Sequence, residues 1–450
     1  MLNAGKPLEW NFLNREIERR VPYKRIGRII SGKGGLYEVR LPSAVIGSEV
    51  EFITERNNRS LGEVVSLKDS ESILVMPYEE LQDINSKTEV SLKEKISTLK
   101  VSENILGRIL DAHGRPLDDK GPLLGPFREM PLMGKITNPL DRPPIDSILD
   151  TGVSSINAFM SIGKGQRMAI MAGPGVGKSV LLGMIARNTK VDVNVIALVG
   201  ERGREVLEFV KNDLGEEGLK KSVIVVATSD SSALLRMKAA YTACTIAEYF
   251  RDKNNDVLFM MDSVSRFAFA HREIALATGE PPGQKGYAPS IFHKLPTILE
   301  RAGTKKGAGS ITGIYTVLVE GGDFDEPISD AIRAISDGHL ILSRELAAKN
   351  HYPAIDILNS ISRLMFKVVS KEHRIIANYL RELYAAYKES EDLINVGAYV
   401  KGTNIKVDKA LLIRDELEQF LKQEVEESIT NEVVYDRMVE IARLAEKINE

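Results

Sequence analysis

Short runs in which apolar and polar residues alternate dominate residues 21–95. These runs are RIGRII, LYEVRL, EVEFI, GEVVSL and SILVMPY, and the turn-forming stretches GKGG, RNNRS and KDSES separate them. Alternation with a period of two is typical of strands that bury one face. The pattern fits a small β-barrel or a sandwich, and we predict a β-barrel domain over residues 21–95.

The middle of the chain has a different pattern. RMAIMA, NVIALV, SVIVVA and DVLFMM are almost continuously apolar. Helix-like stretches alternate with them, at residues 178–188, 203–213 and 231–251. Apolar strands that alternate with helices indicate a parallel sheet buried on both faces. We predict an α/β domain over residues 96–375, with the turn-rich segment 96–150 as its entry linker.

Both ends of the chain carry apolar residues at helical spacing. In residues 1–20 the stripe consists of Trp10, Leu13 and Ile17, with charged residues around it. It is either a helix that packs on its own domain or a docking helix for another protein, such as a regulator. At the other end, heptad-like apolar spacing predicts a helical domain over residues 376–450.

Composition narrows the class of protein. A chain of 450 residues is expected to form about three domains. A content of 43% hydrophobic and 27% charged residues is that of an ordinary soluble protein, and the net charge of −3 predicts no nucleic-acid partner. No run approaches the ~20 apolar residues that span a bilayer. Cys244 is the one cysteine, so no internal disulfide forms and a cytoplasmic location is expected.

The sequence AGPGVGKS, Ala172–Ser179, is the main chemical motif. A glycine-rich turn between a strand and a helix lets backbone N–H groups surround phosphate oxygens, at the positive end of the helix dipole. Lys178 can reach the terminal phosphates and the Ser179 hydroxyl can bind Mg²⁺. The predicted nucleotide contacts are Gly173, Pro174, Gly175, Val176, Gly177, Lys178, Ser179 and Val180.

Carboxylates and arginines follow two of the other predicted strands. Asp262 ends VLFMMD, where an acid can act on Mg²⁺ through a water. Glu201, after NVIALV, can orient a water toward the terminal phosphoryl group. Glu201 could instead form a surface ion pair with a nearby arginine. Because the sequence also contains a phosphate loop, we favour the catalytic role. Arg202 either positions that carboxylate or contacts phosphate, and Arg266 either faces the same pocket or forms a structural ion pair.

Tyr352 and Arg363 lie in the stretch YPAIDILNSISR. A tyrosine face can stack on a purine, and an arginine can neutralise the charge that develops during phosphoryl transfer. From residue types alone, we interpret both as structural.

The order of motifs resembles one family over roughly residues 20–400. GQRMAIMAGPGVGKS, ALVGERGREV, FMMDSVSRFAFAHREIALATGEPP, KGYAPSIFHKLPTILERAG, GSITGIYTVL, ISDGHLILSR, HYPAIDILNSISR and EDLINVGAY are similar to the ATPase of the bacterial flagellar protein-export apparatus. That family includes the injectisome type III secretion ATPases and is related to the catalytic subunit of rotary ATP synthases. The resemblance implies a central RecA-like P-loop ATPase domain between an N-terminal β-barrel and a C-terminal helical domain.

The resemblance also implies roles for individual residues. Gly173–Ser179 would be the phosphate loop, Glu201 the water-activating carboxylate and Asp262 the Walker B acid, with ATP and Mg²⁺ bound. The other implied roles are active-site arginines at Arg202 and Arg266, adenine stacking by Tyr352, and a finger from a neighbouring subunit at Arg363. The likeness therefore reverses the structural interpretation of Tyr352 and Arg363.

Partners and location follow from the same resemblance. It implies a homo-oligomer, usually a hexameric ring, with a stator or regulator at the N-terminus and a central stalk near Gly397–Asp408. It further implies export-gate membrane proteins, secretion substrates and their chaperones, and a cytoplasmic place at the inner-membrane export apparatus. Hydrolysis would help to unload or unfold substrates at the gate.

Other functions remain as alternatives. An injectisome ATPase shares nearly every motif. A non-catalytic ring subunit is disfavoured because Glu201 is present. An RNA translocase needs basic and aromatic surfaces, and residues 21–95 have only Tyr23, Tyr37, Phe52 and Tyr78 without a dense stacking motif. A rotary ATP synthase subunit is less favoured, since VEGGDFDEPISDAIRAISDGH resembles the export enzymes more.

Overall fold

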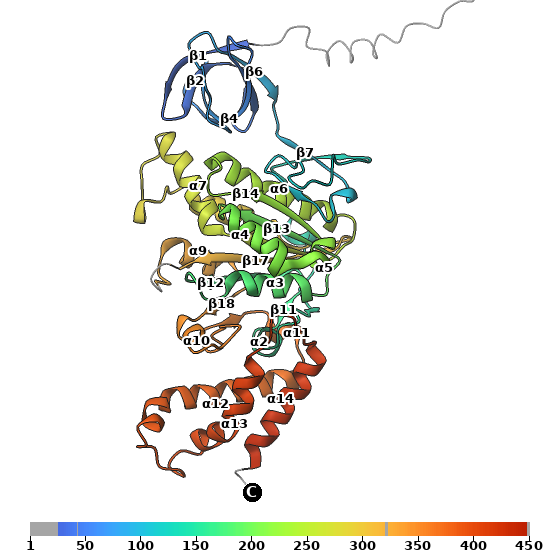
Figure 1. Cartoon of the computed structure of the whole chain (residues 1–450), viewed down its shortest axis with the longest axis vertical. Helices are drawn as coiled ribbons and strands as arrows, with labels where there is room; N and C mark the ends of the chain where they lie inside the picture. The colour runs from blue at the N-terminus through green and yellow to red at the C-terminus, as the bar shows by residue number, and fades with distance from the viewer. Residues whose placement is uncertain (1–25, 43, 320–322, 448–450) are drawn as a thin grey trace, which may run out of the picture. The chain divides into compact units, whose positions relative to one another are not determined.

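A computed structural model describes residues 26–42, 44–319 and 323–447 of the chain (Figure 1). The predicted docking segment, residues 1–20, lies outside the described residues. The chain divides into two compact units, Met1–Ser97 and Thr98–Glu450.

The first unit is a closed barrel in the strand order β1-β2-β5-β4-β3-β6. Its strands are β1 (Ile26–Lys33), β2 (Leu36–Arg40), β3 (Glu49–Ile53), β4 (Arg59–Leu67), β5 (Ser72–Pro77) and β6 (Glu89–Glu94). Alternate residues such as Val39, Phe52 and Val64 are fully buried inside it. Closure pairs every strand on both sides, so no edge is left open. The prediction of a barrel is confirmed.

The second unit is built on a nine-stranded sheet. Along the sheet lie β19 (Ile361–Ser362), β18 (Gly338–Leu342), β12 (Arg167–Ala172), β17 (Ser310–Leu318), β15 (Val257–Asp262), β13 (Val193–Val199), β14 (Ser222–Ala227) and β8 (Ile109–Leu110), with β16 (Gly303–Thr304) beside β17. All neighbours pair in parallel except β19 and β16, which are antiparallel. This is the predicted parallel α/β core.

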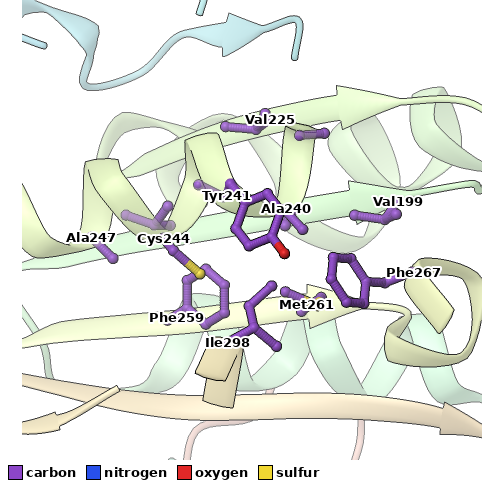
Figure 2. Close-up of a cluster of buried hydrophobic side chains, with 14 of the residues drawn as sticks. Val199, Val225, Ala240, Tyr241, Cys244, Ala247, Phe259, Met261, Phe267 and Ile298 are labelled. Atoms are coloured by element: carbon purple, nitrogen blue, oxygen red, sulfur yellow. The ribbon is translucent and has the colours of Figure 1, made fainter. Parts of the chain in front are cut away.

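Side chains of one strand enter two separate cores. Val195 and Val199 of β13 pack in the core with α6 (Ala233–Arg251) and α7 (Val264–Ala277), whereas Ile196 packs with α3 (Lys178–Asn188). Burial on both faces explains why these strands are almost continuously apolar. Figure 2 shows part of the α6 and α7 core, where Tyr241 and Phe267 meet edge to face at 5.8 Å. Cys244 is buried in the same core as a free thiol.

The segment before the phosphate loop contributes structure of its own. β7 (Thr98–Val101) pairs with β9 (Arg128–Pro131), and β10 (Ile148–Leu149) pairs with β11 (Ile162–Gly163). Arg301 donates to the carbonyl of Leu132 and to the Glu248 carboxylate, which ties this segment to α6. The short strand β8 places the expected linker in the central sheet itself.

The C-terminal part is helical, as predicted. Its helices are α12 (Lys371–Asn395), α13 (Ile405–Leu421) and α14 (Asn431–Glu446), and all three contact α2 (Ser154–Phe159). Leu380, Ile413 and Met438 are buried between them. The remaining α-helices are α4 (Gly203–Glu208), α5 (Gly215–Lys220), α8 (Ile291–Leu299), α9 (Pro327–Ile335), α10 (Arg344–Ala348) and α11 (Met365–Val368). Within the described ranges, no helix is long and apolar enough to cross a bilayer.

Candidate nucleotide site

Three loops meet at the carboxyl edge of the central sheet. The phosphate loop follows β12, Glu201 follows β13, and Asp262 is the last residue of β15. β17 lies between β12 and β15, and β13 is the next strand along. Parallel strands end at the same edge, and open α/β sheets bind ligands there. The sheet order thus brings together residues that are 84 positions apart.

The phosphate loop has the backbone conformation that its glycines allow. Gly175 and Gly177 have φ values of 75° and 86°, in the left-handed region that residues with a Cβ seldom adopt. Val176 between them is buried, which anchors the loop to the core. Gly177 caps α3 without a side-chain hydrogen bond, so the first N–H groups of α3 face an open turn that suits an anion.

Lys178 lies between two acids. Its Nζ is 2.5 Å from Oδ1 of Asp262 and 3.5 Å from Oε1 of Glu201. Burial alone lowers the pKa of the ammonium, but the charges of the two carboxylates outweigh burial and the net pKa is raised. The lysine is therefore charged and preorganised in a site from which water is largely excluded.

Thr316 holds the Walker B acid and was missed by sequence analysis. Its Oγ1 donates to Oδ1 of Asp262 at 2.6 Å from the neighbouring strand β17. A polar residue near the end of the apolar run SITGIYTVL was the available sign. Asp262 thus has two donors, Thr316 and Lys178, that fix its carboxylate.

Glu201 is held by Arg266. Nε of Arg266 is 3.2 Å from Oε1 of Glu201, and Nη2 is 3.4 Å from Oε2. The arginine stem lies over Gly200, where a Cβ would approach its Cδ to 2.8 Å, so the glycine makes room for the pair. Burial, with the nearby charge of Asp262, raises the pKa of Glu201 to about 7. A carboxyl group with this pKa can accept a proton at neutral pH.

The rate of ATP hydrolysis should therefore fall as the pH drops below about 7, which gives the pH profile an acid limb. Glu201 must be ionised to act as a base, so kcat/KM should fall about tenfold per pH unit below the pKa. Arg266→Gln removes a cation that lowers this pKa, and its limb should move to higher pH. The measurement is phosphate release from pH 5.5 to 9, with Arg266→Lys as the charge-retaining control. If the acid limb of Arg266→Gln lies at the same pH as that of the wild type, Arg266 does not lower the pKa of Glu201 and this explanation is wrong.

Tyr352 lies beside the phosphate loop. A Cβ on Gly177 would be 3.4 Å from Cδ1 of the Tyr352 ring, which is an ordinary van der Waals contact. The tyrosine is 43% exposed, so part of this residue is accessible to a ligand. Arg344, missed by sequence analysis, lies beside the first glycine: its Nε would be 2.8 Å from a Cβ on Gly173. A charged residue two positions after the strand GHLIL was the sign for Arg344.

Two predicted arginines lie away from this cluster. The Arg202 side chain is 77% exposed and pairs with Glu205 at 3.7 Å. Arg363 is exposed just after the edge strand β19 and donates from Nη2 to the carbonyl of Arg333 at 3.1 Å. The described contacts of these two arginines do not include Lys178, so their predicted roles remain predictions for a bound or assembled state.

The residues present fit a nucleotide with Mg²⁺. Ser179, the second residue of α3, is exposed toward solvent, and Asp262 supplies an acid at the sheet edge. In the part of the chain that the structure describes, no group of three or more His, Cys, Asp or Glu residues is placed to hold a metal. This donor set suits Mg²⁺, which is usually held by one or two protein ligands together with substrate phosphates.

Comparison with known proteins gives the family. The nucleotide-binding domain of the ATP synthase alpha/beta family matches residues 152–362, and the C-terminal domain of the type III secretion ATPase EscN matches residues 369–440. The flagellum-specific ATP synthase of Bacillus subtilis is 49% identical over 415 residues, which cover 91% of this chain and 94% of the relative. The chain belongs to the family of flagellar and type III secretion ATPases.

Other members of this ATPase family support the assignment. The flagellum-specific ATP synthase of Salmonella typhimurium is 48% identical over 359 residues, which are 78% of each chain. The assembled ATPase EscN from the enteropathogenic E. coli type III secretion system superposes with a TM-score of 0.87 at 42% identity, over 92% of this chain and all of EscN. EscN has also been solved with its central stalk EscO, and that chain superposes with a TM-score of 0.85. The expected resemblance and fold class are confirmed.

Proposed function

We propose that this protein hydrolyses ATP to energise protein export through the bacterial flagellar apparatus. The observation that carries the proposal is the ion-pair cluster of Lys178 and Arg266 with the buried carboxylates of Glu201 and Asp262, beside the phosphate loop. The names of the curated relatives support the flagellar assignment. An injectisome ATPase is the second candidate, because EscN aligns over nearly the whole chain.

The cluster supports a sequence of steps. The phosphates of Mg-ATP enter the phosphate loop and draw the Lys178 ammonium from the carboxylates to the terminal phosphoryl group. Ser179 and Asp262 would hold the Mg²⁺ ion that comes with the substrate. Glu201, fixed by Arg266, orients a water molecule. The water oxygen attacks the terminal phosphorus, and the Glu201 carboxylate takes up the proton that the water loses. The bond to the bridging oxygen breaks, and ADP and phosphate leave.

A homohexameric ring completes the proposed site. Arg363 is exposed on the edge of the sheet, where it is free to reach a neighbouring subunit as a finger. The assembled state of EscN supports an oligomeric state for this chain. Arg202, also exposed, is proposed to join the site when nucleotide or neighbour is bound.

Specific activity should therefore rise steeply with protein concentration. Lys178 and Glu201 would come from one chain and Arg363 from the next. Mixing Arg363→Ala with Glu201→Gln chains should restore some activity, since a fraction of interfaces then pairs an intact Glu201 with an intact Arg363. Turnover and the mass of the assembly, by light scattering, are measured at each protein concentration. Activity that stays flat across assembly, without rescue in the mixture, shows that each chain works alone.

The tip of the C-terminal helices is the proposed contact for a central stalk. Leu393, Val396, Val400 and Ile405 are exposed there, each by more than half. Asp408 holds the intervening loop, because it accepts from the Gly402 N–H at 2.8 Å and the Tyr399 hydroxyl at 3.0 Å. Exposed apolar side chains on a loop held by these bonds suit contact with the apolar face of a partner helix. The complex of EscN with EscO supports this assignment.

Other partners belong to the same proposal. Residues 1–20 are proposed to bind a cytoplasmic stator or regulator. Export-gate membrane proteins, secretion substrates and chaperones complete the machinery at the inner membrane, and no nucleic acid is expected.

A genetic replacement tests the function. The chromosomal gene is replaced by wild-type or Glu201→Gln coding sequence, and secreted flagellar filament protein and swimming are measured. Both should be lost in the Glu201→Gln strain. If the Glu201→Gln strain still swims but no longer secretes a different set of proteins, the ATPase serves an injectisome instead. Stimulation of purified ATPase by RNA would contradict both candidates.

A further inference from the structure

The loop between α13 and α14 contacts the nucleotide-binding core. We call residues 423–429 the connector. Arg187 Nη2 donates to the carbonyl of Val425 at 2.6 Å, and Asn188 Nδ2 donates to that of Glu427 at 2.9 Å. Arg187 and Asn188 are the last two residues of α3, the helix that begins at the phosphate loop.

Gln423 is the buried centre of the connector. Its Oε1 accepts from the backbone N–H of Ser154 at 2.8 Å, and its Nε2 donates to the carbonyls of Gly152 at 2.8 Å and Glu427 at 2.9 Å. The residue is only 6% exposed. A primary amide is required here, because one end must accept and the other must donate twice.

The backbone of Gln423 reaches Tyr352. Its N–H donates to the Tyr352 carbonyl at 3.0 Å, and the Tyr352 ring in turn lies against Gly177 of the phosphate loop. The side-chain bonds fix the position of this N–H, and the N–H fixes the peptide that carries the tyrosine. Gln423 is thus linked to the proposed base-stacking residue without facing the phosphates.

We propose that Gln423 is a positioning residue for recognition of the nucleotide base, acting through Tyr352. This inference rests on the proposed function, in which Tyr352 stacks on adenine. Helix α13 begins at the proposed stalk contact and ends two residues before Gln423. Gln423 therefore connects the proposed base site to the helix that the stalk would contact.

The side chain can be tested with an isosteric change. Gln423→Glu keeps an acceptor for Ser154 but places a second oxygen against two carbonyls, which displaces the backbone at residue 423. The connector remains attached through Arg187 and Asn188. Since partial loss of base stacking weakens nucleotide binding, KM for ATP should rise on the order of tenfold while kcat at saturation is retained.

Base-free tripolyphosphate separates positioning from general damage. Its Mg complex carries the phosphates alone, so its inhibition constant against ATP hydrolysis should stay unchanged in Gln423→Glu. Gln423→Ala is measured in parallel in case the glutamate variant does not fold, with circular dichroism as the check. Glu426→Gln, an exposed position on the connector, is the matched control. Equal rises in KM and in the inhibition constant overturn the proposal, as does no rise in either.

A double-mutant comparison tests the route through Tyr352. Tyr352→Ala should raise KM for ATP and leave tripolyphosphate inhibition unchanged, and adding Gln423→Glu should then have little further effect. Additive rises overturn the route. If Tyr352→Ala has no effect while Gln423→Glu does, the stacking role is wrong and the inference falls with it, whereas the export ATPase function, tested in cells through Glu201, stands.

Discussion

Replacement of Lys178 by alanine should lower ATP hydrolysis on the order of 10³-fold, the scale seen when a preorganised charge-stabilising group is lost. The ammonium lies between Asp262 and Glu201, and its side chain is only 14% exposed. Its removal deprives the terminal phosphates of a cation. It also removes the positive charge that lowers the pKa of Glu201, so this carboxyl group takes up a proton more readily and is less available as a base.

Two measurements separate this loss from misfolding. Phosphate release is followed with saturating Mg-ATP, and circular dichroism checks the fold. Lys220→Ala is the matched control, since this lysine is exposed on α5 and pairs with Glu217 across one helical turn, away from the phosphate loop. Normal turnover in a folded Lys178→Ala protein contradicts the assignment of the phosphate loop.

Local patterns were sufficient for most of the fold. In barrel strands such as Glu49–Ile53, apolar and polar residues alternate because one face is exposed to solvent. Core strands such as Val193–Val199 are almost entirely apolar because both faces are buried. The glycines of the phosphate loop are equally local, since their φ values need no distant partner. By contrast, Ile109–Leu110 is a strand of two residues, too short for any periodicity, and its pairing with β14 depends on tertiary structure.

The site was predictable where a residue follows a strand, and not where a residue acts from across the sheet. Glu201 and Asp262 end or follow their strands, so the sheet edge brings them together. Thr316 reaches Asp262 from a strand that comes 54 residues later, and only the order of β17 beside β15 makes it a neighbour. Gln423 lies still further along the chain, and its partners Gly152 and Ser154 precede the phosphate loop.

Glu201→Gln should keep Mg-ATP binding and slow hydrolysis on the order of 10²-fold or more, since a general base typically contributes that much. Glutamine has the shape of glutamate, and its oxygen can still accept from Arg266. It cannot accept the proton of the attacking water. Loss of one negative charge beside Lys178 also lessens repulsion of the phosphates, so affinity for ATP should not fall.

The decisive readout compares binding with chemistry in the same variant. Nucleotide affinity is measured by equilibrium binding and turnover by phosphate release, across the pH range of the wild-type acid limb. Glu208→Gln is the matched control, because Glu208 lies on the neighbouring helix α4 and pairs with Arg204 at the surface. If Glu201→Gln loses ATP binding but the residual turnover keeps the acid limb near pH 7, Glu201 is a structural ion-pair partner of Arg266 and another group supplies the base. A flat pH profile at low turnover identifies Glu201 as the group that titrates, since no other change was made to the cluster.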